Sequence, residues 1–309
     1  MNRIALALLI CSSSLLFAQS PNRNPNKSEP PILGPHWTRD QARRRPASSG
    51  ADLLYHGGPI LPSVTVKAIF WGPSWTTSPG DKITGLDKFY SYIGTVSGGS
   101  GSAYEATVNE YTNSGGQHVT SAITYQGHVT DSSNLPKHIS TSAVLAEACK
   151  MVGSSAVANG FYPVYVDRKR GGANYCAYHS WGSCNGTPVE FGFFFNLDGD
   201  AGCNPQSGVS GESQGLAALA NVSGHELSET RSDPNGNAWY ASNGEENADE
   251  CAWTFGGSYV TFLDGSKWKI QGNWSNEAND GTSPNGPGYT TSLGKGCVDG
   301  SNYDGPYTK

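Results

Sequence analysis

The cysteine content limits the folds open to this sequence more than any other feature. Seven cysteines occur, and six of them follow the N-terminal region: Cys149, Cys176, Cys184, Cys203, Cys251 and Cys297. In an exported chain an even number of cysteines indicates a disulfide framework, here of up to about three bridges with about 15 possible pairings. We expect one local bridge within the cluster of Cys176, Cys184 and Cys203, and one bridge between Cys251 and Cys297.

The first 18 residues have the features of a cleaved secretion signal. Arg3 supplies a positive charge, residues 4–17 are largely apolar, and the run ends at the small residue Ala18. The apolar run is shorter than the roughly 20 residues that a membrane-spanning helix needs. We therefore expect residues 1–18 to be a signal peptide, and the mature protein to be secreted, extracellular or periplasmic, without a membrane anchor.

Residues 19–50 differ in composition from the rest of the chain. They are rich in Pro, Asn, Arg and Ser, and a segment with so little apolar surface cannot offset the entropy lost on folding. We expect a disordered lead-in, in which residues 43–45, three consecutive arginines, are either a processing or surface-binding element or, as we prefer, part of a solvated tail. Residues 51–309 are then a single globular domain. The net charge of -6 argues against nucleic acid as a partner.

Hydrophobic periodicity predicts strands that alternate with helices over the first part of the domain. The expected strands are residues 64–71, 122–129, 162–166 and 189–195, and the expected helices are residues 83–93, 140–152 and 215–230. Short strands are expected around residues 259–263 and 267–270. This order predicts an α/β or α+β layered domain with a mixed sheet and a loop-rich, disulfide-linked C-terminal half.

The helix at 215–230 contains the most informative motif, His225-Glu226-Leu227-Ser228-Glu229. Positions i and i+4 lie on one face of a helix, so His225 and Glu229 project together as two metal ligands do. Glu226 lies about 100° around the helix from His225, within reach of a water that a metal activates. The preceding residues are small and apolar, and acids placed after such a stretch are costly to bury unless a metal pairs with them.

The spacing of this motif and of the acids after it resembles the active site of thermolysin-type gluzincin metallopeptidases. The matching positions are His225, Glu226, Glu229, Asp233, Tyr240, Asn243, Gly244, Glu246 and Asp249. The resemblance implies a metalloprotease-like domain whose active-site helix supplies the ligand His225 and the general base Glu226. It also implies that Glu246 is a ligand and that Asp233 and Asp249 are acids that orient a ligand imidazole.

One position departs from that pattern, because the family has a second ligand histidine where this chain has Glu229. A carboxylate can bind zinc, and the expected ligand set is then His225, Glu229 and Glu246. Zn²⁺ is the expected cofactor, but a set with two carboxylates also suits Ca²⁺ or Mn²⁺ and is compatible with a structural metal in an inactive enzyme. His179 is a candidate for the compensating imidazole, for a catalytic role in positioning substrate, or for a structural role.

A second resemblance extends over residues 55–300. The segment Tyr55-His56-Gly57-Gly58-Pro59-Ile60-Leu61 and the segment Cys176-Ala177-Tyr178-His179 are similar to the EXORDIUM, or phosphate-induced protein 1, family. The active-site helix, followed by Asp233-Pro234 and Ala238-Trp239-Tyr240, is similar to microbial relatives. The resemblance implies an extracellular protein and leaves catalysis open.

These observations predict a secreted zinc-dependent hydrolase, a peptidase, that acts on an extracellular polypeptide. The alternative is a non-catalytic extracellular or cell-wall-associated protein with structural calcium or no metal. A third possibility is an enzyme that acts on a cell-wall polymer with Glu226 and Glu229 as paired carboxylates. We rank it last, because two acids on one short helical stretch are poorly placed to flank a glycosidic bond.

Overall fold

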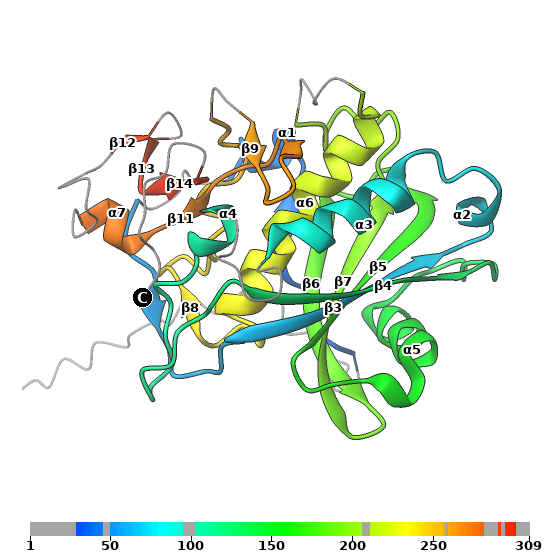
Figure 1. Cartoon of the computed structure of the whole chain (residues 1–309), viewed down its shortest axis with the longest axis horizontal. Helices are drawn as coiled ribbons and strands as arrows, with labels where there is room; N and C mark the ends of the chain where they lie inside the picture. Colours follow the sequence, from blue (N-terminus) through cyan, green and yellow to red (C-terminus); the bar gives the residue numbers. More distant parts are fainter. Residues whose placement is uncertain are drawn as a thin grey trace, which may run out of the picture.

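The fold is given by a computed structural model, which describes residues 29–45, 50–94, 103–205, 211–256, 259–280, 290–291 and 294–300. The expected signal peptide and the first part of the expected lead-in lie outside these residues. The described chain forms a mixed six-stranded sheet with helices and a C-terminal region of short strands (Figure 1). This is the expected α+β class with a mixed sheet.

The sheet has a parallel half and an antiparallel half. In spatial order its strands are β1 (Leu33–Trp37), β6 (Tyr175–Cys184), β7 (Thr187–Asn196), β5 (Gly160–Lys169), β3 (Ser63–Trp71) and β4 (Ala122–Asp131). Strands β4, β3, β5 and β7 run parallel, whereas β6 pairs antiparallel with β7, and β1 pairs antiparallel with β6. The apolar runs of β3, β5 and β7 are buried, as expected for strands covered on both faces.

Helices cover the two faces of this sheet. Helices α3 (Lys82–Ile93) and α6 (Gln214–Ser232) lie side by side across one face, and α5 (Thr141–Val152) lies against the other (Figure 1). The remaining helices are short: α1 (Arg39–Ala42), α2 (Ser74–Thr77), α4 (Ala103–Ala106), the 3₁₀ turn Gly153–Ser155 and α7 (Asn276–Asp280). The long helices and central strands match the expected elements within a few residues.

Helix α6 is buried along nearly its whole length, and its sequence permits this. Ser213 caps its first turn, because its Oγ accepts the Leu216 N–H at 3.1 Å. Small residues bring neighbours close: a Cβ on Gly224 would stand 3.1 Å from the Tyr104 hydroxyl. The acids and the histidine at the C-terminal end of α6 therefore lie in the interior.

A buried ion pair fixes the end of α6 that carries these groups. Arg231 and Glu105 of α4 are both fully buried and face one another. Arg231 also donates to the backbone carbonyl of Thr120, and burial lowers its pKa to about 9. Breaking such a pair leaves an uncompensated buried charge, so α4 holds α6 in place.

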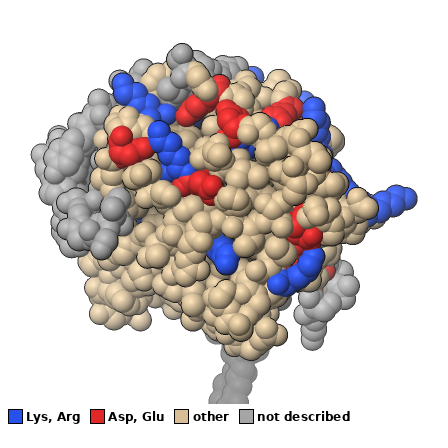
Figure 2. Space-filling view, turned by 45° about the vertical axis from the view of Figure 1, so that its right-hand side comes forward, with Lys and Arg blue, Asp and Glu red and all other residues tan. Residues whose placement is uncertain are grey.

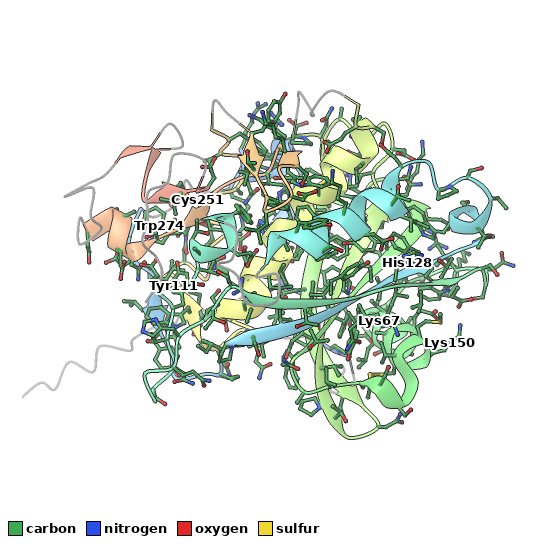
Figure 3. All side chains as sticks on the ribbon, in the orientation of Figure 1. Lys67, Tyr111, His128, Lys150, Cys251 and Trp274 are labelled. Carbon is green, nitrogen blue, oxygen red and sulfur yellow. A yellow bond between two sulfur atoms is a disulfide. The ribbon has the colours of Figure 1, made fainter. Side chains whose placement is uncertain are left out.

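The C-terminal half is built from two-stranded ribbons around a second core. The ribbons pair β2 (Leu54–Tyr55) with β8 (Trp239–Tyr240), β9 (Val260–Thr261) with β10 (Lys267–Trp268), β11 (Asn273–Trp274) with β14 (Cys297–Val298), and β12 (Thr290–Thr291) with β13 (Gly294–Lys295). Tyr111, Cys251 and Trp274 belong to this second core, and the Tyr111 hydroxyl donates to the Trp274 carbonyl at 2.6 Å (Figure 3).

The six cysteines form three disulfides. Cys176–Cys203 is the expected local bridge, and Cys251–Cys297 is the expected bridge of the C-terminal half. The third, Cys149–Cys184, joins α5 to the end of β6. Three disulfides are typical of a protein that folds in an oxidising, extracellular environment.

The expected disorder of residues 19–50 is wrong for residues 29–45. Leu33–Trp37 is edge strand β1, and its backbone is held further where Thr38 N–H donates to the Asn174 carbonyl at 2.8 Å. The two β1 residues that are buried are Gly34 and His36. Hydrogen bonds and polar contacts hold this strand, rather than large hydrophobic side chains. Its composition therefore gave no signal that it folds.

No helix among the described residues is long and apolar enough to cross a membrane. On the face shown in Figure 2, uncharged residues dominate, and Lys or Arg side chains lie among Asp and Glu side chains rather than in a patch of one sign. Several acids, among them Glu226, Glu229 and Asp233, lie instead in the interior.

Replacing both Cys251 and Cys297 by Ala should lower the free energy of unfolding by about 2–4 kcal/mol, because the bridge closes a long loop. Denaturant unfolding measures this loss. The matched control is the pair Cys149 and Cys184 replaced by Ala, which should cost a similar amount of stability. Only the first pair should also weaken metal binding, because Cys251 directly follows the acidic segment 246–250. Equal metal binding by the two variants would contradict the expectation that the Cys251–Cys297 bridge holds the acidic segment 246–250 in place.

Candidate metal centre

The C-terminal half of α6 places His225 and Glu229 on one face, as their spacing predicts. His225 Nε2 lies 3.2 Å from Glu229 Oε1, and both side chains are fully buried. The loop after β8 brings a third group to them: Asp249 Oδ1 lies 3.7 Å from His225 Nε2. Around one zinc, donors bound at about 2.0–2.2 Å stand about 3.4 Å apart in a tetrahedron, so these separations suit a shared cation.

A second group of atoms adjoins the first on the other side of Glu229. His179, from β6, has its Nε2 3.2 Å from Glu246 Oε2 and 3.8 Å from Glu229 Oε2. Single donor atoms of His179, Glu226 and Glu229 lie within 4.8 Å of one another, and so do those of His225, Glu229 and Asp249. Glu229 belongs to both groups.

The structure therefore brings the expected residues together, but Asp249 and Glu246 exchange the partners that the resemblance implied. The resemblance implied Glu246 as the third ligand beside His225 and Glu229, with Asp249 orienting a ligand. In the structure Asp249 stands with His225, while Glu246 contacts His179. Asp233 lies at the end of α6, where its Oδ1 accepts the N–H groups of Asn237 and Ala238 at 2.6 and 2.7 Å.

Backbone and amide groups orient the centre. The Asp249 N–H donates to Glu229 Oε1 at 2.9 Å, which fixes one oxygen of that carboxylate. Gln271 Nε2 donates to the Ala248 carbonyl at 2.7 Å and contacts His225 Nδ1 at 3.0 Å. Gln271 is itself held by Asn221, whose Oδ1 accepts the Gln271 N–H at 2.9 Å.

The orientation of Gln271 decides where His225 carries its ring proton. Since Gln271 Nε2 donates to Ala248 and Gln271 Oε1 accepts the Trp253 N–H at 3.2 Å, His225 Nδ1 is an acceptor and Nε2 carries the proton. A cation held at Nε2 would need the neutral ring to carry its proton at Nδ1. Gln271 would then have to present Oε1 to that proton and give up its hydrogen bonds to Ala248 and Trp253. Gln271 is thus a positioning residue for His225.

His36 of β1 is a member of the centre that sequence reasoning missed. Its ring lies 4.6 Å from the His225 ring at an angle of 67°, and its Nε2 lies 3.0 Å from Gln271 Oε1. His36 was assigned to the disordered lead-in, and Gln271 lies just after a short expected strand with no motif to mark it. Only the fold reveals that they meet.

Burial dominates the electrostatics of the centre. It raises the pKa of Glu226, Glu229, Glu246 and Asp249 well above their ordinary values, and neighbouring carboxylates add to the shift for all of these except Glu246. At Glu226 the nearby backbone groups of His36 and His179 offset the shift in part. Burial also lowers the pKa of His36 and of His179 to about 4, and it lowers that of His225 well below its ordinary value. The imidazoles are therefore neutral near pH 7, which is the form that binds metals.

Several buried polar atoms of the centre have no hydrogen-bond partner of normal geometry. They are His225 Nε2, Glu229 Oε2 and both oxygens of Glu226. In the described chain the ion pairs of Glu229, Glu246 and Asp249 involve imidazoles alone, and no Lys or Arg joins them. Unpaired buried carboxylates are strongly destabilising, so the residues fit a divalent cation.

Comparisons with protein-family models, with curated proteins and with solved structures returned no match for this chain. The chemistry of the centre therefore rests on its own residues: neutral imidazoles and carboxylates that converge in a buried position. Imidazole and carboxylate ligands suit Zn²⁺ and Mn²⁺.

Without a cation, the free energy of unfolding should fall as the pH rises from about 7.5 to about 8.5. Burial raises the pKa of Asp233 to about 8 from 3.8, and those of Glu226 and Glu229 shift in the same direction. A carboxyl with a raised pKa stabilises the fold fully below its unfolded value and progressively less up to its folded value, by up to about 1.4 kcal/mol per pH unit.

Thermal unfolding of the protein in a chelator, at several pH values in this window, measures the slope. At and above about pH 7.5 the imidazoles are close to neutral in both states, since the ordinary pKa of His is about 6.5, so the carboxyls dominate. Asp233→Asn should reduce the slope, and added zinc should abolish most of it. A melting temperature that is constant or rises over this window would contradict the assignment.

Proposed function

We propose that this protein is a secreted metal-dependent hydrolase, with zinc as its cation and extracellular polypeptides as its substrates. The observation that carries the proposal is the convergence of His225, Glu229 and Asp249 beside Glu226, in a centre where no Lys or Arg among the described residues forms an ion pair with Glu229 or Asp249. A divalent cation there would act as a Lewis acid and lower the pKa of water, which is how hydrolases use it.

The chain's own groups supply the remaining parts. His225, Glu229 and Asp249 would hold the cation, and the backbone N–H of Asp249 keeps Glu229 oriented. Glu226 follows His225 on the helix, and both of its oxygens are free of hydrogen bonds of normal geometry. A carboxylate with a raised pKa is suited to take a proton from an attacking water and pass it to the leaving amine. His179 provides the second imidazole that the helix lacks at position 229.

The resemblance to the EXORDIUM family remains part of this proposal, and one arrangement supports it. Two segments that carry the resemblance lie together: β2 pairs with β8, Gly58 N–H donates to the Asn237 carbonyl at 2.9 Å, and the His56 ring stacks on Tyr240 at 3.6 Å. The N-terminal motif thus braces the segment between α6 and the acidic loop.

A non-catalytic protein with a structural cation is the second candidate, and the burial of the centre favours it. His179, His225, Glu226 and Glu229 are each 0% exposed. A working hydrolase with this centre needs a route by which substrate reaches it, whereas a structural cation needs none.

Replacing Glu226 by Gln should separate the two candidates. The hydrolase should retain its zinc and lose casein cleavage by about 10²–10⁴-fold, because the side chain keeps its size and loses its function as a base. Elemental analysis and a peptide-release assay measure both properties. Glu190→Gln is the matched control: Glu190 is a buried glutamate on β7 outside the centre, so this variant should behave as the wild type.

A wild-type protein that binds zinc but cleaves no peptide substrate, before and after the N-terminal segment is removed, would support the structural role instead. A Glu226→Gln variant with full activity would exclude Glu226 as the base.

A further inference from the structure

We propose that the centre binds two divalent cations and that Glu229 bridges them. The inference deepens the proposed function, since it concerns the same centre, but its test is the amount of metal bound rather than activity. The first support is the geometry: two groups of donor atoms, one with His225 and Asp249 and one with His179 and Glu226, share Glu229 as their common member.

The two oxygens of Glu229 face different groups. Oε1 lies 3.2 Å from His225 Nε2 and accepts the Asp249 N–H. Oε2 has no hydrogen-bond partner of normal geometry and lies 3.8 Å from His179 Nε2. A carboxylate with one oxygen toward each of two imidazoles is placed to bind a cation on each side. Bridged two-cation centres are a recurrent arrangement in hydrolases.

The charge of the centre is the second support. Glu226, Glu229, Glu246 and Asp249 carry four negative charges when ionised, and among the described residues no Lys or Arg forms an ion pair with Glu229, Glu246 or Asp249. One divalent cation would leave two charges uncompensated in the interior, whereas two divalent cations balance all four. Full balance matters because an uncompensated buried charge costs several kcal/mol, by order of magnitude. Protons are the other way to balance the charge, and the metal content distinguishes the two.

The test is the metal content of the whole protein, loaded with zinc, freed of weakly bound ions and measured by elemental analysis. We expect about two zinc ions per chain in the wild type and in Glu190→Gln, and about one in His179→Gln. Loaded with Mn²⁺, the wild type should give the electron paramagnetic resonance spectrum of two coupled ions. Glu229→Gln should abolish the coupling. Circular dichroism verifies that each variant is folded.

About one ion per chain in the wild type, together with hydrolysis that depends on Glu226, would overturn the bridged pair and leave the proposed function standing. Two ions without magnetic coupling would overturn the bridge. No bound metal in the wild type would overturn both proposals and leave a centre balanced by protons.

A separate observation concerns β1, and from it we infer that residues 33–45 are an inhibitory strap that closes the centre. Gly34 has a φ of +43°, and a Cβ there would lie 1.8 Å from Glu229 Oε2 and 2.9 Å from His179 Cδ2. Gly34 thus places bare backbone directly against the two residues. His36, two positions later, covers the His225 ring.

The way in which the strap is attached would allow it to separate from the domain. β1 is an edge strand paired only with β6, with register irregularities on both sides of His36. Residues 29–45 contain no cysteine, so no disulfide retains them. The strap ends in three arginines, of which Arg43 and Arg44 are exposed. Hydrolysis of the peptide bond after either residue, by a protease that cleaves after basic residues, would cut the covalent link between β1 and the domain and leave β1 held by its non-covalent contacts alone.

The test compares the full chain before and after limited digestion with trypsin, with the new N-terminus determined by sequencing. Cleavage after Arg43 or Arg44 should speed the loss of zinc to a chelator at least about tenfold, and should raise peptide hydrolysis. A variant with all three arginines replaced by Gln should resist both changes.

Gly34→Ala provides a second test without a protease, because its Cβ collides with Glu229 and should push β1 away, which speeds zinc loss. Gly171→Ala is the matched control, since Gly171 has a φ of +61° with nothing within 4 Å of its Cβ position, and the strain arises there without a collision. Cleaved protein that has lost β1 but exchanges zinc at the original rate would overturn the strap. Zinc loss is measured independently of hydrolysis, so a protein that binds zinc and cleaves no peptide still gives a result.

Discussion

Burial of ionisable groups at the C-terminal end of α6 is the constraint on which the rest of the structure depends. Four carboxyls and three imidazoles meet there in the interior. Each carboxylate without a countercharge would destabilise the fold, and the whole domain yields only about 5–15 kcal/mol of net stability. A cluster of this kind persists only if cations or protons balance it. The Asp249 N–H orients the Glu229 carboxylate, and the Gln271 amide holds the loop at Ala248. Both hydrogen bonds keep the oxygen ligands in positions from which they could bind a cation.

The fold supplies this centre from four distant parts of the chain. The sheet presents β6 and β1, helix α6 lies across it, and the loop after β8 closes over the helix. The disulfide Cys251–Cys297 follows the acidic loop immediately, so it limits how far Asp249 can move from α6. The Arg231–Glu105 pair holds the other side of the helix. A site assembled from such separate segments needs these cross-links, because each loop by itself has little apolar surface to anchor it.

The sequence predicted the contacts of the centre between residues close together in the chain, and it missed the contacts between distant segments. The relation of His225 to Glu229 follows from helical spacing, and the central strands and long helices follow from their periodicity. The sequence could not show that Asp249 rather than Glu246 stands beside His225, because a loop has no fixed period. Nor could it show His36, since a strand that buries only a glycine and a histidine has no hydrophobic signature. Both misses concern contacts between segments far apart in the chain.

Glu229 is the residue whose interpretation the structure changes most. From the sequence it is a departure, a carboxylate where a histidine ligand was expected, and that suggests a weakened site. An imidazole offers one lone pair to a metal, whereas a carboxylate offers two oxygens that can bind in different directions. In this structure the two oxygens of Glu229 do face different partners, His225 on one side and His179 on the other. A histidine at position 229 could serve only one of them. In the proposed two-cation centre, a glutamate at position 229 therefore fits better than a histidine would.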